Sequence, residues 1–325
     1  MGRMRGKATS WVELVAVLLL LGPTVGAASP PGPPGASVAG DAAESLLREY
    51  DALPKTTPAA QYDRFVATHP GLLTASARPY GPALLWALEF ERSEAAMALL
   101  RAGAAIPPGA VTLAARGGLD EIIPLLVARG AQESDRDTAM LAAAKYGHAS
   151  TLRLLIALGA KVAVAAPNDG FTPLHVAVMD RRIEAIRVLL AAGAPLEARD
   201  HHGQTPLGWG PFAYVPQAKH IYQKLGQPHD TVFVDPGEAE AMKLLLDAGA
   251  SLTATDDEGN TPLHHAALLG SVRGAEVLLA RGASVTVKNR KGQTPLSLAK
   301  TRQSPALFEL LQKHPSRSQR PKPVK

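Results

Sequence analysis

The tripeptide Thr-Pro-Leu recurs along this chain, and its recurrence limits the folds open to the chain more than any other feature. It begins at four positions, with spacings of 33, 56 and 33 residues: Thr172, Thr205, Thr261 and Thr294. A second mark, Gly-Ala after an apolar run, begins at Gly103, Gly130, Gly159, Gly193, Gly249 and Gly282. A unit repeated at a nearly fixed period is the signature of a repeat array.

The two marks together place seven repeats. In the repeats opened by Thr172 and Thr261, the Gly follows the Thr by 21 residues. Counting back the same distance from the three earliest glycines gives degenerate copies, so the repeats begin near residues 82, 109, 138, 172, 205, 261 and 294. The fifth repeat is longer by 23 residues, which indicates an insertion at 209–236.

Each repeat reads as a helix, a turn and a second helix. The Thr caps the first helix and the Pro occupies its first position, where a missing N–H costs nothing. An Ala-rich segment follows, then a second helix such as residues 185–190, and the closing Gly supplies a left-handed residue after its end. One such unit cannot bury its apolar face alone, so the sequence predicts an all-α repeat solenoid.

These repeats resemble the ankyrin repeat, whose pattern is Asp-x-x-Gly-x-Thr-Pro-Leu-His followed by a helix pair ending in Gly-Ala. Residues 200–207 and 256–261 match this pattern, and residues 289–294 match it with Asn in place of Asp. The resemblance extends over residues 79–314 and implies short β-hairpin fingers between repeats. It also implies that His175 and His264 hydrogen-bond to neighbouring backbone, and that the protein is a non-enzymatic binder of another protein.

Two departures from the ankyrin pattern lie in the early repeats. The first two repeat spacings are only 27 and 29 residues, which predicts a finger that is shortened or missing there. Pro124 falls within a second helix, where it is tolerated only near the N-terminus of that helix.

The segments outside the array predict export. Residues 1–27 hold a basic start, the apolar run Trp11–Leu21 and small residues before a cleavage point near Ala27, which is the anatomy of a signal peptide. A retained anchor is the alternative, although spanning a bilayer takes about 20 apolar residues. A Pro-rich linker (28–40), an N-terminal helical cap (41–78) and a basic disordered tail (315–325) complete the predicted organisation. We therefore expect a periplasmic or secreted protein without a membrane span after cleavage.

Composition and motifs exclude several kinds of site. The chain has no Cys, which excludes disulfides, thiolate metal sites and a cysteine nucleophile. The net charge is +5, but residues 28–312 carry −2, which disfavours nucleic-acid binding across the folded body. No phosphate loop, G-x-S-x-G or H-E-x-x-H motif occurs, so we predict no catalytic residue and no cofactor. The alternative function is a metal-dependent hydrolase or metal-binding protein centred on the insertion, with four nearby histidines, His201, His202, His220 and His229.

The predicted binding face follows from the repeat register. Ankyrin-like repeats commonly contact partners through the finger tips and the two residues after the Ala pair of the first helix. That second row, seven and eight positions past each start, holds Phe90, Tyr146, Met179, Phe212, Leu268 and Leu269. The finger row holds Phe171, His201, His202, Asp257, Glu258, Arg290 and Lys291, and the insertion adds Tyr214.

An apolar stripe flanked by polar fingers suits a protein-binding groove. The alternative is that the insertion and the cap fold over the stripe and bury it, so the insertion is either a lid or a binding loop. The combined expectation is an exported bacterial ankyrin-like protein, monomeric, that binds a protein partner through its concave face. Such proteins resemble neutralisers of secreted toxins and accessory proteins of oxidative-stress enzymes, and the sequence does not choose between these two roles.

Overall fold

The structure is a computed structural model, which describes residues 45–46, 48–50, 52–54, 56–73, 76–77, 81–211, 236–301 and 304–314. All of them belong to one compact unit, composed of Val38–Ala213 and Val232–Lys325. A second unit, Met1–Ser37 with Tyr214–Thr231, lies outside the described residues. The predicted signal peptide, linker and tail, the insertion from residue 212 to 235, Phe212, Tyr214, His220 and His229 therefore also lie outside them.

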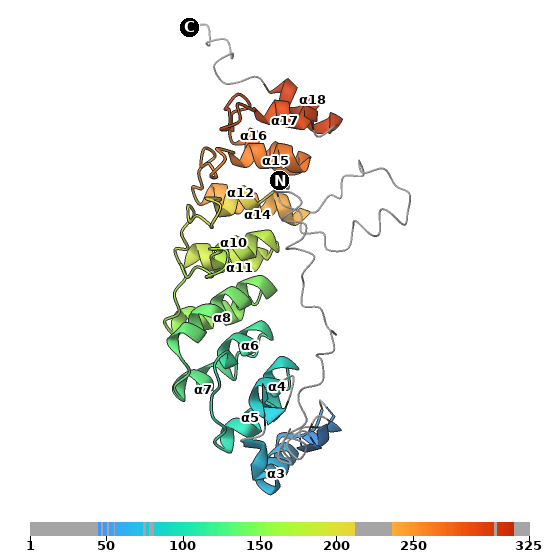
Figure 1. The fold of residues 1–325 in the computed structure, drawn as a ribbon, viewed down its shortest axis with the longest axis vertical. Helices are drawn as coiled ribbons and strands as arrows, with labels where there is room; N and C mark the ends of the chain where they lie inside the picture. The colour runs from blue at the N-terminus through green and yellow to red at the C-terminus, as the bar shows by residue number, and fades with distance from the viewer. Residues whose placement is uncertain are drawn as a thin grey trace, which may run out of the picture. The chain divides into compact units, whose positions relative to one another are not determined.

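Seven helix pairs follow one another in the described residues, one pair for each predicted repeat (Figure 1). The first helices are α4 (Ala83–Glu89), α6 (Ala110–Arg116), α8 (Glu133–Tyr146), α10 (Pro173–Met179), α12 (Pro206–Trp209), α15 (Pro262–Leu269) and α17 (Pro295–Thr301). The second helices are α5 (Ser93–Arg101), α7 (Ile123–Ala128), α9 (Ala149–Ala157), α11 (Ile183–Ala191), α14 (Pro236–Asp247), α16 (Val272–Ala280) and α18 (Pro305–Lys313). Each first helix contacts the first helix of the next repeat, which confirms the predicted all-α solenoid.

The repeat marks act as helix start and stop signals, as predicted. Thr172 and Thr261 each form a capping box with the His three residues later, and Pro occupies the first helical turn. The six glycines of the Gly-Ala mark have φ between 77° and 100°, the left-handed conformation that ends a helix. Pro124 lies in the first turn of α7, where it breaks no helical hydrogen bond.

The third repeat departs from the pattern because its first helix is extended toward the N-terminus. Helix α8 begins at Glu133, five residues before the Thr138 that marks the repeat start, and this extra helical turn takes the place of a finger. The side chain of Asp135 in that turn accepts hydrogen bonds from the backbone N–H groups of Val111 (3.0 Å) and Thr112 (3.3 Å). Helix α6 begins after Gly109, which has no side chain to cap it, so the cap comes from the next repeat.

The later fingers are tight turns that contain no β-strand in the described residues. One backbone hydrogen bond joins each finger to the next. The donors and acceptors are His201 N–H and the Asp169 carbonyl (2.9 Å), Asp257 N–H and the His202 carbonyl (3.0 Å), and Arg290 N–H and the Glu258 carbonyl (2.9 Å). Within each of these fingers one backbone hydrogen bond closes the base of the turn, for example Asp200 N–H to the Gln204 carbonyl (3.0 Å), and a strand ladder requires a succession of such bonds. The fingers expected as β-hairpins are therefore turns linked side by side.

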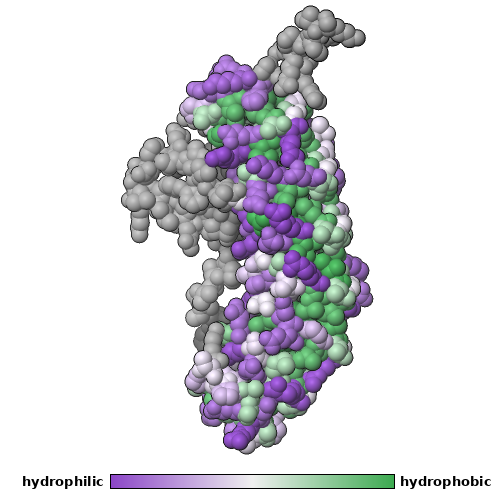
Figure 2. All heavy atoms as spheres, turned by 180° about the vertical axis from the view of Figure 1, so that it is seen from behind, coloured by the Kyte–Doolittle hydropathy of each residue, from purple (hydrophilic) through white to green (hydrophobic). Residues whose placement is uncertain are grey.

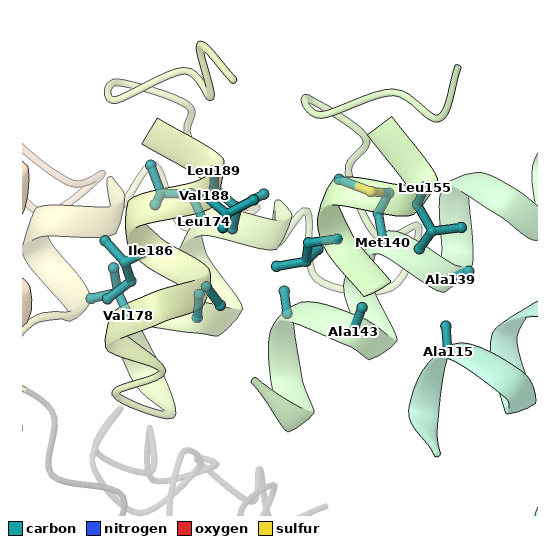
Figure 3. Packing of buried hydrophobic residues seen from close by; sticks show 14 of the residues in the cluster. Ala115, Ala139, Met140, Ala143, Leu155, Leu174, Val178, Ile186, Val188 and Leu189 are labelled. Atoms are coloured by element: carbon teal, nitrogen blue, oxygen red, sulfur yellow. The ribbon is translucent and has the colours of Figure 1, made fainter. Parts of the chain in front are cut away.

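The core consists mainly of Ala and Leu between stacked helices (Figure 3). Ala143, Leu174 and Leu189 are fully buried, and Figure 3 shows side chains of successive repeats pointing toward one another. Small Ala side chains let neighbouring helices approach closely, while Leu side chains fill the space between repeats. This packing places the ends of the first helices in register along the array.

Aromatic residues cover the N-terminal end of the array. Residues 45–46, 48–50 and 52 are helical, and α3 (Ala59–Thr68) contacts α5. The buried Tyr50 donates a hydrogen bond to the Ala95 carbonyl (2.7 Å), and its ring packs against Tyr62 and Trp86. The 3-10 helix η1 (Pro70–Leu73) and a short antiparallel pair, β1 (Ser76–Ala77) with β2 (Gly81–Pro82), connect this region to α4.

The fifth repeat has a first helix of a single turn, α12. All its residues are buried, and an added Cβ at Gly210 would lie 2.5 Å from Cγ of Met242 on α14, so only Gly allows this close approach. Among the described residues, no helix has the length and apolarity that a bilayer crossing requires.

Candidate interaction surface

Three large apolar side chains are exposed among the described residues, and all three occupy the same repeat register. Phe90 is 38% exposed, Tyr146 is 44% exposed and Leu269 is 36% exposed. Each lies eight positions past the start of its repeat, where the first helix ends. The repeat stacking therefore places three of the predicted stripe residues on equivalent corners of the array.

The other described members of the stripe are less open. Met179 and Leu268 are half-buried, and Leu268 packs against the core. They lie seven positions past their repeat starts, so the helix turns them further inward than the eighth position. We call the set Phe90, Tyr146, Met179, Leu268 and Leu269 the helix-end row.

The exposed rings of Phe90 and Tyr146 each lie next to another aromatic ring. The Phe90 ring lies 5.6 Å from the ring of Trp86, which is itself buried, and the Arg92 guanidinium stands 5.0 Å from the Trp86 ring centroid. Tyr146 is nearly parallel to His148, with ring centroids 6.4 Å apart. Side chains held in this way lose little conformational entropy on binding, which favours them as contact residues.

Polar contacts between repeats fix the backbone of the row. The imidazole of His148 hydrogen-bonds to the Arg116 carbonyl (2.9 Å), and the Arg182 guanidinium donates to the Lys145 carbonyl (2.9 Å). Arg116 also pairs with Glu89 at 2.6 Å. These contacts join the ends of α4, α6 and α8 to the adjacent repeats.

One carboxyl group beside the row has an altered acidity. Burial raises the pKa of Asp180, although Lys145 and Arg182 act in the opposite direction. Both cations are exposed, so the surface around Tyr146 and Met179 is polar at its edges and apolar between them.

The finger tips are held by a buried polar residue at the base of each turn. Asp200, Asp256 and Asn289 each accept hydrogen bonds from the backbone N–H groups two and four residues later. This Asx-type turn leaves the tip side chains outside the core. His201, Asp257, Arg290 and Lys291 are exposed, whereas His202 and Glu258 are half-buried.

Aromatic and amide groups tie the fingers to the helices behind them. The indole N–H of Trp209 donates to Asp200 (2.8 Å), and the half-buried Phe171 lies edge-on to Trp209, with ring centroids 5.2 Å apart. Phe171 thus helps to pack the finger while keeping part of its ring open.

His265 and Asn260 hold a second finger base in the same manner. His265 lies 3.1 Å from the Asp256 carboxylate, and the Asn260 amide donates to it at 3.0 Å. Burial alone would raise the pKa of Asp256, but the hydrogen bonds from His265 and Asn260 lower it to about 2. The carboxylate is therefore a structural element of the finger.

The two motif histidines have structural contacts. His175 hydrogen-bonds through Nε2 to the Gln204 carbonyl, and His264 bonds in the same way to the Gln293 carbonyl, both at 3.1 Å. Burial is the main cause that lowers the pKa of both side chains, and each Nδ1 faces its capping Thr. The prediction that they orient neighbouring backbone is confirmed.

No group of three His, Asp or Glu side chains in the described part of the chain could hold a metal ion. His201 and His202 occur there, but their predicted companions His220 and His229 fall outside it. The described residues thus offer nothing in favour of the metal alternative.

Two functional features of the scaffold were missed by sequence reasoning. Asp135 as the cap of α6 has a weak sequence signal, because its partners lie 23 and 24 residues away. The bond from Trp209 to Asp200 was also missed. The register could have indicated it, since Trp209 occupies the position that His265 holds in the next repeat.

Apolar surface is not confined to the helix-end row. Figure 2 shows the array from behind, with hydrophobic residues gathered in a band along one side and hydrophilic residues interspersed. What distinguishes the row is side-chain size and shared register rather than hydropathy alone.

Two segments of the array match known repeat families. Residues 111–200 match a family described as ankyrin repeats (3 copies), and residues 245–299 match one described as ankyrin repeats (many copies). A tyrosine-protein kinase of Hydra vulgaris is 36% identical over 102 residues, which are 30% of this chain and 14% of the kinase. An E3 ubiquitin-protein ligase of Arabidopsis thaliana is 30% identical over 153 residues, 47% of this chain and 8% of the ligase.

A third relative, a fowlpox virus protein named for its ankyrin repeats, is 27% identical over 131 residues. The match covers 38% of this chain and 93% of the viral protein. This chain spans less than a sixth of the length of the kinase and of the ligase. Helix pairs, capping histidines and matched segments agree that residues 111–200 and 245–299 are ankyrin repeats, and the other described helix pairs stack on them in the same order.

Proposed function

We propose that this chain is an exported, non-enzymatic module that binds a protein partner through the helix-end row and the finger tips. Ankyrin repeats are protein–protein interaction modules, and this supports the general function. The observation that carries the more specific proposal is the common register of the three exposed apolar residues Phe90, Tyr146 and Leu269. Binding interfaces are enriched in such residues at their centres.

The geometry suits a partner that lies across several repeats. Phe90, Tyr146 and Leu269 belong to the first, third and sixth repeats, and stacking of the first helices connects them. The finger tips add exposed charges of both signs, Asp257 and Arg290 among them. Large apolar groups would supply most of the affinity, while the charges would select orientation and partner.

Tyr146→Ala and Phe90→Ala test this assignment. Each aromatic contact should be worth about 2 kcal/mol or more as a hot spot, so partner binding should weaken at least about tenfold. The unfolding midpoint should barely change, because both side chains are more than a third exposed. Glu276→Ala, on the exposed side of α16, is the control that should change neither property.

The assay begins with affinity capture from a periplasmic extract, and the captured protein is then titrated against purified variants. If the aromatic variants unfold the protein, these residues belong to the core. If they bind as well as wild type and remain stable, the interface lies elsewhere, with the His201 and His202 finger as the next candidate.

Export is the second part of the proposal, and it rests on the order of basic, apolar and small residues in positions 1–27. A partner outside the cytoplasm could be a secreted toxin or an oxidative-stress enzyme, the two roles suggested by the resemblance to exported ankyrin-like proteins. The identity of the captured protein distinguishes them.

A further inference from the structure

The charge of this chain is concentrated at one end of the sequence. Residues 282–325 contain ten Lys or Arg and a single acidic residue, Glu309, which gives them a formal charge of +9. The whole chain carries +5, so the residues before this segment are net acidic. A charge asymmetry of this size indicates an interaction with an anionic partner.

The described part of this segment presents its cations on the surface. Lys288, Arg290 and Lys291 lie in the last finger, where Asn289 is buried and accepts hydrogen bonds from Lys291 N–H (3.1 Å) and Gln293 N–H (2.9 Å). The turn around Asn289 leaves all three cationic side chains exposed. Lys300, in the last turn of α17, is exposed as well. We call these four residues the basic end.

Little negative charge compensates the basic end. None of its four side chains forms an ion pair with any carboxylate that the structure describes, and Glu309 pairs with Lys313 at 3.6 Å. In the adjacent finger, Asp256 is bound by His265, and Asp257 faces Arg199 at 3.7 Å. The half-buried Glu258 is the one acid of that finger that faces Lys291.

We propose that the basic end docks the array on an anionic lipid bilayer surface. Exposed, unpaired cations without a shaped pocket suit a diffuse negative surface, which needs no fixed geometry. Single-stranded nucleic acid is disfavoured because its binding uses exposed aromatic platforms, and Phe308, the aromatic residue of the last repeat, is half-buried. The further cations of residues 315–325 add charge of the same sign. This contact uses the exposed Arg290 and Lys291 of the last finger, which also belong to the proposed partner surface, so a bilayer and a protein partner would compete for that finger.

Vesicle co-sedimentation of the full chain tests the proposal. The probes are vesicles of phosphatidylcholine with 30% phosphatidylglycerol, and vesicles of phosphatidylcholine alone. The triple variant Lys288→Gln, Arg290→Gln, Lys291→Gln should bind the anionic vesicles at least tenfold more weakly than wild type at 0.1 M salt. Wild-type binding should fall as salt is raised, because salt screens charges at this range. All variants share the apolar run Trp11–Leu21, so any binding through this run is the same in each of them. Binding to the neutral phosphatidylcholine vesicles measures that contribution.

The matched control removes three exposed cations elsewhere: Arg64→Gln, Arg153→Gln, Lys243→Gln. It has the same net charge as the test variant and should bind like wild type. A charge-preserving variant, Lys288→Arg with Lys291→Arg, should also retain binding, and circular dichroism checks that each variant is folded. Equal binding of test and control variants would overturn the proposal, as would the absence of binding to anionic vesicles. Binding of duplex DNA through the same residues, with vesicles unbound, would overturn it in favour of a nucleic-acid partner.

Discussion

Replacing Asp135 with Ala should destabilise the array although the residue lies far from the helix-end row. Its carboxylate accepts three hydrogen bonds from the preceding repeat, from Val111 N–H (3.0 Å), Thr112 N–H (3.3 Å) and the Thr112 hydroxyl (2.7 Å). Asp135 is 6% exposed, so water does not replace it easily. The substitution removes the cap of one helix by changing a residue in another.

The magnitude follows from what is left unsatisfied. Val111 is fully buried, and leaving its N–H without an acceptor costs about 1–3 kcal/mol. Thr112 is only partly buried, and its hydroxyl keeps Thr138 as a partner at 2.7 Å, so its loss is smaller. We expect Asp135→Ala to lower the free energy of unfolding by about 2–4 kcal/mol, because bonds to a charged acceptor are stronger than neutral ones. Asp135→Asn keeps the shape and one acceptor oxygen, so its free energy of unfolding should lie between those of wild type and Asp135→Ala.

Urea unfolding followed by circular dichroism measures these differences. Glu133→Ala is the control, since its side chain is 62% exposed and pairs with Lys161 only at 3.7 Å. Exposed ion pairs of this kind contribute about 0–1 kcal/mol. If Asp135→Ala costs no more than Glu133→Ala, capping between repeats does not stabilise this part of the array.

Three further predictions concern the core, the response to acid and the N-terminus. Leu189 is fully buried in the central repeat, so Leu189→Ala should cost about 2–5 kcal/mol in denaturant unfolding, and Leu311→Ala in the last repeat should cost less because it has a neighbouring repeat on one side only. The pKa of Asp256 is lowered from 3.8 to about 2, so the folded state binds this proton less readily than the unfolded state. Stability from this group should be complete above pH 4 and should be lost as the pH falls toward 2, and Asp256→Asn should remove that part of the pH dependence of the urea midpoint. N-terminal sequencing of the mature protein should begin at Ala28 or Ser29, and a mature chain that retains Met1 would contradict export.

The register of the array was predictable because its signals are local. Thr, Pro and Gly act within one or two helical turns of their own position, so Thr172, Pro173 and Gly193 mark helix ends without knowledge of the fold. The exposure of Phe90, Tyr146 and Leu269 followed from the same register. Trp86 and Trp209, each four positions past the start of its repeat, are both 4% exposed, so this position belongs to the core in both repeats.

What could not be predicted depends on contacts between repeats. The cap that Asp135 gives to α6 crosses more than 20 residues, and an Asp three residues into a helix has an adequate local explanation without it. The absence of strands in the described fingers depends on how few backbone bonds form across each turn, which the residue pattern does not contain. The half-burial of Met179 and Leu268 was not predicted because the seventh and eighth positions were treated alike, and the helix turns the seventh position further inward.

The close fit of α12 on α14 makes the fifth repeat a permissive place for changes in chain length. Gly210 lies against Met242, so the two helices are joined by their own packing on either side of the insertion. A longer or shorter segment between residues 212 and 235 would then leave the order of the helices unchanged. Closing a flexible connection costs only about 0.6 kcal/mol more for each doubling in its length. We expect the array to fold with a reporter domain or an unrelated recognition sequence inserted at this position.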